Sequence, residues 1–382
     1  MTERSEGDGP LSARALNRAL LARQGLIDPF DGPLTETVES VGAIQAQQWT
    51  SPPVALWSRR RDFTGDELWA ALDRGDLVTG ILLRRTLHLV SAREHPAYAV
   101  VATGSGVDGW QGLKVARTAG ADRLLGDLLA YAGQSRTGDE LHDFVEAWVE
   151  AHPGGLSDAE VAAQRAYRWR VLRASPALVR VPADGRWAAR TPAAYRAAAE
   201  SGDLDPDVAH DMAVRRHLRA FGPAGADDVA YWLGVRVPVV RAAVDRIGAE
   251  LVRFADEDGR VLYDLPDAPR PGPDGEVPVR FLPAFDSALL AYAAGRRTRI
   301  LPDAYRDRVY VRANLRWLPT VLVDGFVAGV WATRVSRRVA TVTVTPFGRL
   351  PRGTRAAVTG VAERLIRFVE PAATDHQVVV EG

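Results

Sequence analysis

The order of the expected elements constrains this chain more than any other feature, because helices followed by a pair of strands recur along it. In the first copy, apolar spacing predicts helices over 11–26 and 35–44. The capping-box sequence at 64–67 opens a third helix. Residues 77–82 and 84–90 then have the pattern of paired strands. Three helices followed by a hairpin is the order of a winged helix.

The same order returns twice. In the second copy, a helix is expected over 121–131, and capping-box sequences at 137–140 and 157–160 open two more, the latter extending to 172. The segments 178–181 and 186–188 are expected to form a hairpin. The third copy is predicted as three helices and two strands over 208–221, 227–233, 237–247, 251–254 and 261–265. Its strands flank Asp258-Gly259, a strong two-residue turn signal. A helix-turn-helix followed by a wing fits this copy.

A Pro/Gly/Asp-rich stretch from 266 to 278 predicts a linker, and the pattern beyond it changes to strands. Strands are expected over 320–323, 327–331 and 339–344, with a last helix over 355–368. We therefore expect an α+β chain of three tandem winged-helix modules and a small β-rich C-terminal module. The four parts are assigned to residues 11–104, 105–200, 201–270 and 271–382.

Composition narrows the chemistry. The 382-residue chain has no cysteine, which excludes disulfides, thiolate metal sites and cysteine nucleophiles. Lys114 is its only lysine and hence its only candidate for a Schiff base. The sequence shows neither a transmembrane-length apolar run nor a signal peptide, so we expect a cytoplasmic protein. No metal-ligand spacing and no Gly-rich phosphate loop is present, so no metal and no cofactor are expected.

The formal net charge is zero, so a DNA-binding role requires that the arginines be gathered on one face. Arg334, Arg337 and Arg338 surround a turn between two expected strands, and such a basic hairpin could enter a groove. The other candidates for DNA contact are Arg59, Arg60, Arg168, Trp169, Arg296 and Arg297. The alternative for each cluster is a solvated face, and for the segment around Trp169 it is a core stripe of aromatic residues.

Three segments, in order, carry a family resemblance. The first is Ile44-Gln45-Ala46-Gln47, and the second, 83–88, reads Leu-Arg-Arg-Thr-Leu-His. The third is Leu-Pro-Ala-Phe-Asp at 282–286, followed by 318–325 and Gly-Val-Trp at 329–331. Together they resemble the AlkZ-like DNA glycosylases, a winged-helix family with a Gln-x-Gln motif, over most of the chain from about residue 40 to 335. Arg85 departs from the pattern, since the family often has glycine there, and a bulky cation at this position changes the space or the charge near the pocket.

The resemblance implies a function. It suggests a monofunctional, base-excision DNA glycosylase that acts without a cofactor on alkylated purines in double-stranded DNA. It further suggests bulky N7-alkylguanine adducts or interstrand crosslinks as substrates, and self-resistance to an alkylating natural product as the biological role. We expect a monomer that is associated with the nucleoid when it is bound to DNA.

The chemistry of the first segment fits this function. Two glutamines at positions i and i+2 of an extended segment face the same side, so Gln45 and Gln47 could hold one water against the anomeric carbon. An N-alkylated purine is cationic and leaves without being protonated, so positioning matters more than proton transfer. Gln48 is a weaker candidate. The alternative interpretation is a pair of solvated glutamines at the end of a helix.

Five further residues are assigned to supporting the pocket, namely Arg84, Arg85, Thr86, His88 and Asp286. His88 lies among leucines and valine, a setting that is typical of a core histidine. Asp286 could orient a water or a glutamine, or cap a helix that starts at Ser287.

Two other functions remain open. A transcription regulator without catalysis is compatible with winged helices, although 237–247 carries few base-reading side chains besides Arg241 and Arg246. The third possibility is an inactive homologue that binds DNA or a protein. Convergence of the arginine clusters with Gln45 and Gln47 on one concave surface would favour the enzyme.

Overall fold

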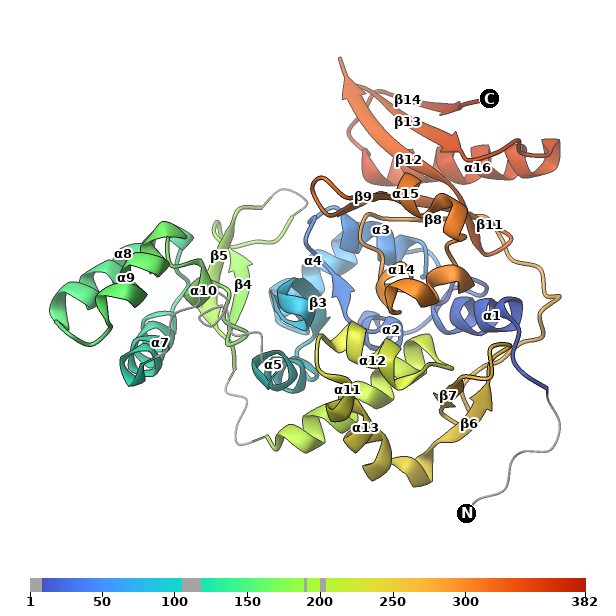
Figure 1. Cartoon of the computed structure of the whole chain (residues 1–382). Helices are drawn as coiled ribbons and strands as arrows, with labels where there is room; N and C mark the ends of the chain where they lie inside the picture. Colours follow the sequence, from blue (N-terminus) through green and yellow to red (C-terminus); the bar gives the residue numbers. More distant parts are fainter. Residues whose placement is uncertain (1–8, 105–117, 189–190, 200–203) are drawn as a thin grey trace.

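A computed structural model describes residues 9–104, 118–188, 191–199 and 204–382 (Figure 1). Within these residues, helices alternate with four small sheets, which confirms the α+β class. Lys114 lies outside the described residues. Among the helices that are described, none is both long and apolar enough to cross a membrane.

The first block begins with four helices and a short strand. Its elements are α1 (Ala13–Arg23), α2 (Leu34–Val41), β1 (Ile44–Gln45), α3 (Ser51–Trp57), α4 (Gly65–Arg74), β2 (Leu77–Ile81), η1 (Leu83–Arg85) and β3 (Leu87–Ser91). The capping box that begins α4 is confirmed, with the Thr64 backbone N–H donating to Glu67 at 3.1 Å. The predicted strand over 84–90 begins too early, because Arg84 and Arg85 have left-handed φ values of 51° and 57°.

The second block forms a lobe at one end of the molecule (Figure 1). The first block ends with α5 (His95–Gly104). The elements of the second block are α7 (Ala119–Tyr131), α8 (Gly138–Ala151), α9 (Asp158–Ala166), α10 (Arg170–Arg173), β4 (Leu178–Pro182) and β5 (Ala193–Ala197). The capping boxes at Thr137 and Ser157 are confirmed. The helix predicted to extend to 172 breaks after Ala166, where Arg168 and Trp169 are left-handed. The second hairpin strand is β5 rather than 186–188.

The hairpins of the first two blocks belong to one sheet. The strand order is β1-β3-β2-β4-β5, and β2 pairs with β4 through Thr79–Arg180 and Gly80–Val179. Gly80 lies where the two hairpins meet, and a Cβ on it would come within 3.2 Å of His95 Nε2. The two expected wings are therefore joined by main-chain hydrogen bonds, and the first two blocks share a sheet.

The third block has the predicted order. Its elements are α11 (Pro206–Phe221), α12 (Ala226–Leu233), α13 (Val237–Arg246), η2 (Gly248–Glu250), β6 (Val252–Ala255) and β7 (Val261–Asp264). Gly234 ends α12 with φ 76°, in the left-handed conformation that glycine adopts at little cost. A Cβ there would lie 3.2 Å from the backbone nitrogen of Arg84, so this turn touches the loop before β3.

The C-terminal part is richer in strands and starts with short elements. It comprises β8 (Arg280–Leu282), α14 (Ser287–Leu290), η3 (Ala294–Arg299), η4 (Asp303–Tyr305), α15 (Arg306–Val309), β9 (Tyr310–Val311), β10 (Arg316–Trp317), β11 (Thr320–Val323), β12 (Phe326–Ser336), β13 (Val339–Pro346), α16 (Arg352–Val369) and β14 (Asp375–Val380). The main sheet has the order β14-β13-β12-β11-β8, and α16 covers one face of it (Figure 1). The expected meander is confirmed, whereas the parallel pairing of β14 with β13 was not predicted.

The C-terminal sheet packs on the first block through α3. Val54 is buried in the same cluster as Trp331 and Leu365, and the ring of Trp57 stacks on Phe368 at 5.8 Å between centroids. The Ser58 hydroxyl donates to the carbonyl oxygen of Phe281 on β8. Because α3 follows the Gln45–Gln47 segment after a short turn, this packing fixes one end of that segment.

Candidate active site

The two glutamines lie at the edge of the sheet that the first two blocks share, Gln45 on its edge strand β1 and Gln47 just beyond the end of that strand. Gln45 of β1 is paired with His88 of β3, and Ala46 N donates to Leu87 O at 2.7 Å. The side-chain oxygen of Gln47 accepts from Leu87 N at 3.4 Å. Gln45 is 5 % exposed, whereas Gln47 is exposed. The pair thus spans the boundary between the interior and solvent.

A turn at 284–287, which we call the clamp turn, holds both ends of the glutamine segment. Ser51 Oγ donates to the carbonyl oxygen of Ala284, and Ser287 Oγ donates to that of Ala43, each at 2.9 Å. Phe285 lies in the middle of the turn with a left-handed φ of 58°, a conformation that costs a non-glycine residue free energy. Residues 43 and 51 are therefore fixed by one short piece of chain that is distant in sequence.

Asp286 anchors the clamp turn. Its carboxylate accepts from Arg59 Nη1 and Nη2 at 2.9 and 2.8 Å and from Ala288 N at 3.0 Å. Of the two roles considered for Asp286, orienting a water or a glutamine and capping a helix, the structure shows the cap, at the start of α14. Arg59 also donates to Gln24 and is fully buried. The expectation that Arg59 contacts DNA is wrong, because its charge is used inside the protein.

The segment 83–88, the second of the three that carry the family resemblance, turns sharply before it enters β3. Arg84 is partly buried and donates to the carbonyl oxygen of Trp232 at the end of α12. Thr86 Oγ1 donates to Leu83 O at 3.2 Å, and Arg85 is partly exposed in the same turn. The left-handed φ of Arg85 explains why glycine suits this position, since glycine has no Cβ to clash there.

His88 is fully buried in β3. Its Nδ1 lies 2.8 Å from the carbonyl oxygen of Thr86, and its Nε2 has no partner among the described residues. Burial, helped by the nearby Arg84 charge, lowers the pKa of His88 to about 3. His88 is therefore neutral at physiological pH.

The remaining candidates for DNA contact differ in exposure. Arg334, Arg337 and Arg338 are exposed around the β12–β13 turn, as expected. Arg296 is exposed and lies 3.9 Å from Asp227. Arg168 is exposed beside Asp139 at 3.3 Å. These five arginines keep surface positions, which leaves their predicted contacts open.

Three other candidates are held by the protein. Trp169 is fully buried and donates to Glu146 at 2.5 Å, so it belongs to the core of the second block and the prediction of DNA contact is wrong. Arg297 is buried between the rings of Tyr231 and Trp317, at 5.1 and 4.8 Å, and is likewise unsuited to a phosphate.

Arg60 is the third. It donates to Gly32 O and Thr37 Oγ1 and pairs with Glu67 at 3.3 Å, so it ties α2 and α4 together. Little of its side chain reaches solvent, which argues against the predicted role in binding phosphate.

Comparison with known families identifies the chain. The model of the DNA glycosylase AlkZ-like family matches residues 38–368. This chain belongs to the AlkZ-like DNA glycosylase family. The match begins just before the glutamine segment and ends in α16, so it includes every element that positions the candidate site.

A solved structure of this family has the same fold. The Streptomyces sahachiroi DNA glycosylase AlkZ superposes with a TM-score of 0.76, covers 98 % of this chain and is itself covered over 100 % of its length. The two sequences are 20 % identical, so the likeness concerns the fold. No significant match was found among curated proteins.

An aromatic cluster beside the glutamines was not predicted in this AlkZ-like chain. The ring of Trp49 lies 4.9 Å from that of Trp187 and 5.8 Å from that of Trp69, and Arg180 is 5.6 Å from it. Trp49 Nε1 donates to Ala188 O at 3.3 Å. The cluster therefore binds the end of the glutamine segment to the β4–β5 loop. Trp49 follows Gln48 directly, and this adjacency was the available signal.

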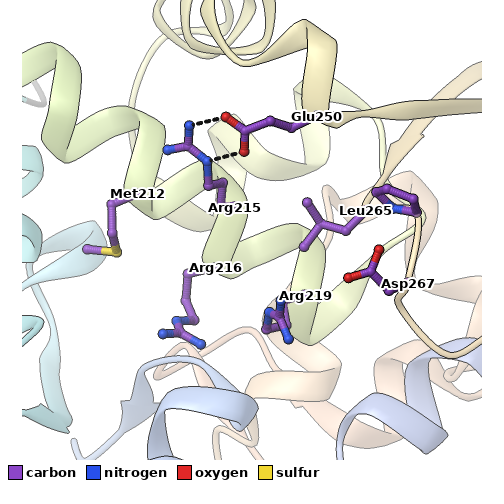
Figure 2. Close-up of a pocket in the computed structure, with 8 residues that line it drawn as sticks. Met212, Arg215, Arg216, Arg219, Glu250, Leu265 and Asp267 are labelled. Carbon is purple, nitrogen blue, oxygen red and sulfur yellow. Dashed lines mark hydrogen bonds and ion pairs between the residues drawn. The ribbon is translucent and has the colours of Figure 1, made fainter.

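A hollow of about 490 Å³ lies elsewhere, along α11. Arg215 pairs with Glu250 at 2.7 Å in its wall, while Arg216 and Arg219 point to the opposite side (Figure 2). Arg216 is paired with Glu94, and Asp267 also lines the hollow. These acids balance much of the arginine charge. In the described part of the chain, no group of three His, Asp or Glu side chains is arranged to hold a metal ion.

Proposed function

We propose that this chain hydrolyses the N-glycosidic bond of alkylated purines in double-stranded DNA, with Gln45 and Gln47 positioning the attacking water. The observation that carries this proposal is the pairing of the glutamine segment with β3. It leaves Gln45 at the inner side and Gln47 at the exposed side of one short segment. The family membership supplies the class of reaction.

The roles of the two amides differ. The Gln47 oxygen is occupied by Leu87 N, so its NH₂ group is the end that remains to donate to a water or to the DNA. The Gln45 amide makes no hydrogen bond to a described residue, so its oxygen can accept a hydrogen bond from the water. A neutral pair of this kind is a weak base, and it suits a cationic N7- or N3-alkylpurine that departs without being protonated.

We further propose bulky N7-alkylguanine adducts or interstrand crosslinks as the substrates, and self-resistance to an alkylating natural product as the role. The exposure of Gln47 supports this, because an open site can act on an adduct that does not fit a deep pocket. Small N7-methylguanine, a bulky N7 adduct and a crosslink in one DNA sequence separate these possibilities. Faster release of the small base than of either bulky adduct would contradict this choice of substrates.

The experiment that tests the activity is base release from a duplex with one N7-alkylguanine. The native chain is expected to generate an abasic site, and the Gln45→Ala/Gln47→Ala double variant is expected to lose release while it still binds DNA. Gln48→Ala is the matched control and should retain activity. Binding without release by the native chain, across small and bulky adducts, would refute the enzyme and leave a DNA-binding protein.

Monofunctional cleavage is tested on the same duplex. Without a Schiff-base lysine the product should be an intact strand with an abasic site, and Lys114→Ala should release the base at the native rate. Strand cleavage that depends on Lys114 would contradict this.

No observation favours the transcription regulator. In α13 the residues Val240, Ala243 and Val244 are buried, and Arg246 is paired with Asp211 at 2.6 Å. Arg241 and Arg246 are both exposed, and of the two only Arg241 has no acidic partner among the described residues. This is fewer base-reading side chains than a recognition helix presents.

A further inference from the structure

Gln45 and His88 face each other across β1 and β3. Residues that are directly opposite in an antiparallel pair point to the same face, with Cβ atoms about 4.5–5.5 Å apart. Both side chains are buried, at 5 % and 0 % exposure. His88 Nε2 and the Gln45 amide each make no hydrogen bond to any described residue. A buried polar atom without a partner is costly, and His88 Nε2 is such an atom. The Gln45 amide lies on the same face and is therefore a suitable partner for it.

The other ring nitrogen fixes the tautomer of His88. Nδ1 lies 2.8 Å from the carbonyl oxygen of Thr86, and a carbonyl oxygen can only accept. Nδ1 therefore carries the hydrogen, and Nε2 of the neutral ring presents a lone pair. The ring stays neutral because burial lowers the pKa of His88 to about 3.

An acceptor at this place selects one orientation of the glutamine amide. The amide has a donating NH₂ end and an accepting oxygen end, and only the NH₂ end can bond to a lone pair. We propose, on the basis of the proposed function, that His88 is a positioning residue: its Nε2 accepts a hydrogen bond from the Gln45 NH₂ group and thereby turns the Gln45 oxygen toward the nucleophilic water. His88 itself transfers no proton in this scheme.

The residue of β2 that is paired with His88 offers it no side-chain partner. On the other side of β3, His88 pairs with Gly80, which has no side chain. His95 of α5 lies above Gly80, is buried, and also has an Nε2 without a partner among the described residues. His95 is thus a second buried imidazole, packed over β2 rather than beside Gln45, and it provides a control.

Two substitutions of His88 separate positioning from packing. His88→Gln places an acceptor oxygen near the former Nε2, whereas His88→Asn keeps a polar group only near the former Nδ1. We expect His88→Asn to lower the single-turnover rate of N7-alkylguanine release by about 10–100-fold with an unchanged Kd for DNA, as a misplaced catalytic group does. His88→Gln should restore the rate to within about threefold of native. Equal losses in both variants, or no loss in His88→Asn, would overturn the proposal.

A spectroscopic readout tests the contact without catalysis. The chain has eight glutamines, so ¹⁵N-glutamine labelling gives few side-chain NH₂ signals, and Gln45→Ala assigns the one of interest. The Gln45 NH₂ protons should be shifted and protected from exchange in the native chain and in His88→Gln, and should lose both properties in His88→Asn. His95→Asn should leave them unchanged.

The two failures are distinguishable. A Gln45 NH₂ signal that is the same in the native chain and in His88→Asn refutes the contact, even if base release is observed. A signal that depends on His88 in a protein that releases no base supports the contact and refutes the proposed function instead.

Discussion

Arg59 and Asp286 form a two-point ion pair, with nitrogen–oxygen distances of 2.9 and 2.8 Å, across 227 positions of the sequence. Both side chains are withdrawn from solvent, at 0 % and 1 % exposure. The pair joins the end of α3 to the clamp turn, the two pieces of chain that hold the glutamine segment. Its geometry thus links the stability of the fold to the placement of the candidate catalytic groups.

Removal of one partner of this pair should destabilise the protein strongly. Asp286→Ala leaves the Arg59 charge buried and unpaired, so we expect a loss of about 3–5 kcal/mol in the free energy of unfolding, measured by urea denaturation. Arg61→Ala, which breaks the exposed pair with Asp31, is the control and should cost less than about 1 kcal/mol. Similar losses in the two variants would contradict the structural role of the pair.

The clamp turn should affect catalysis more than stability when only a hydroxyl is removed. Ser287→Ala deletes the hydrogen bond to the Ala43 carbonyl and loosens one end of the glutamine segment. We expect about a tenfold fall in the single-turnover rate of base release, with the affinity for DNA unchanged.

A remote serine serves as the control for the clamp turn. Ser157→Ala removes the cap of α9, at a cost of about 1 kcal/mol in stability. It should leave the rate of base release unchanged. If the rate of base release fell in proportion to the loss of stability, and by the same proportion in Ser157→Ala and Ser287→Ala, the clamp turn would have no role in positioning.

Local signals explain what the sequence predicted correctly. The capping boxes at Thr64, Thr137 and Ser157 involve residues only three positions apart, so they are visible without knowledge of the fold. The glutamine motif was found by family resemblance, and the matching family model supports that resemblance. The pairing of Gln45 with His88 joins two of the recognised segments, although neither segment indicates it alone.

Long-range contacts explain which features could not be predicted from the sequence. Three consecutive arginines have different surroundings. Arg59 is buried against Asp286, Arg60 pairs with Glu67, and Arg61 pairs with Asp31 at the surface. Their surroundings come from α14, α4 and the loop after α1, and no local pattern distinguishes them. The breaks at Arg84 and Arg168 have the same cause, because non-glycine residues carry no signal for a left-handed φ.

The basic β12–β13 hairpin should supply affinity for DNA. Alanine at Arg334, Arg337 and Arg338 is expected to weaken binding and to reduce the slope of log K against log salt by up to about 0.9 for each phosphate that the protein no longer neutralises. Arg241→Ala on α13 is the control, and its effect on binding should be small. A large effect of Arg241→Ala with little effect of the hairpin substitutions would indicate that α13 recognises DNA, and it would favour the transcription regulator.

Three buried histidines should make the protein sensitive to mild acid. Burial lowers the pKa of His88 and His217 to about 3 and that of His95 to about 4, whereas an unfolded histidine titrates near about 6.5. Below about pH 6.5 the unfolded chain therefore binds protons that the folded chain does not, and stability falls as the pH falls toward 3–4. Each histidine should contribute a loss of about 2 kcal/mol between pH 8 and pH 5.

The acid sensitivity is measured by urea unfolding at pH 8 and pH 5. Glu94 acts in the opposite direction, because burial raises its pKa and its stabilising contribution declines as the pH rises. His217→Leu, which removes one of the three groups, should reduce the pH-dependent loss by about 2 kcal/mol. An unchanged pH dependence in this variant would show that His217 is not the source.

Arg85 stands where the family often has glycine, and two substitutions that both remove its positive charge test what this difference does. Arg85 has φ 57°, where an L-residue is strained and glycine is not, so Arg85→Gly should be more stable than Arg85→Ala by about 1 kcal/mol in urea unfolding. Changes in the preference between bulky and small N7 adducts that both variants share report the loss of the guanidinium. Changes confined to Arg85→Ala report the backbone of the turn before β3. Equal stabilities would show that the turn relaxes out of the left-handed conformation, and the glycine common in the family would then need another explanation.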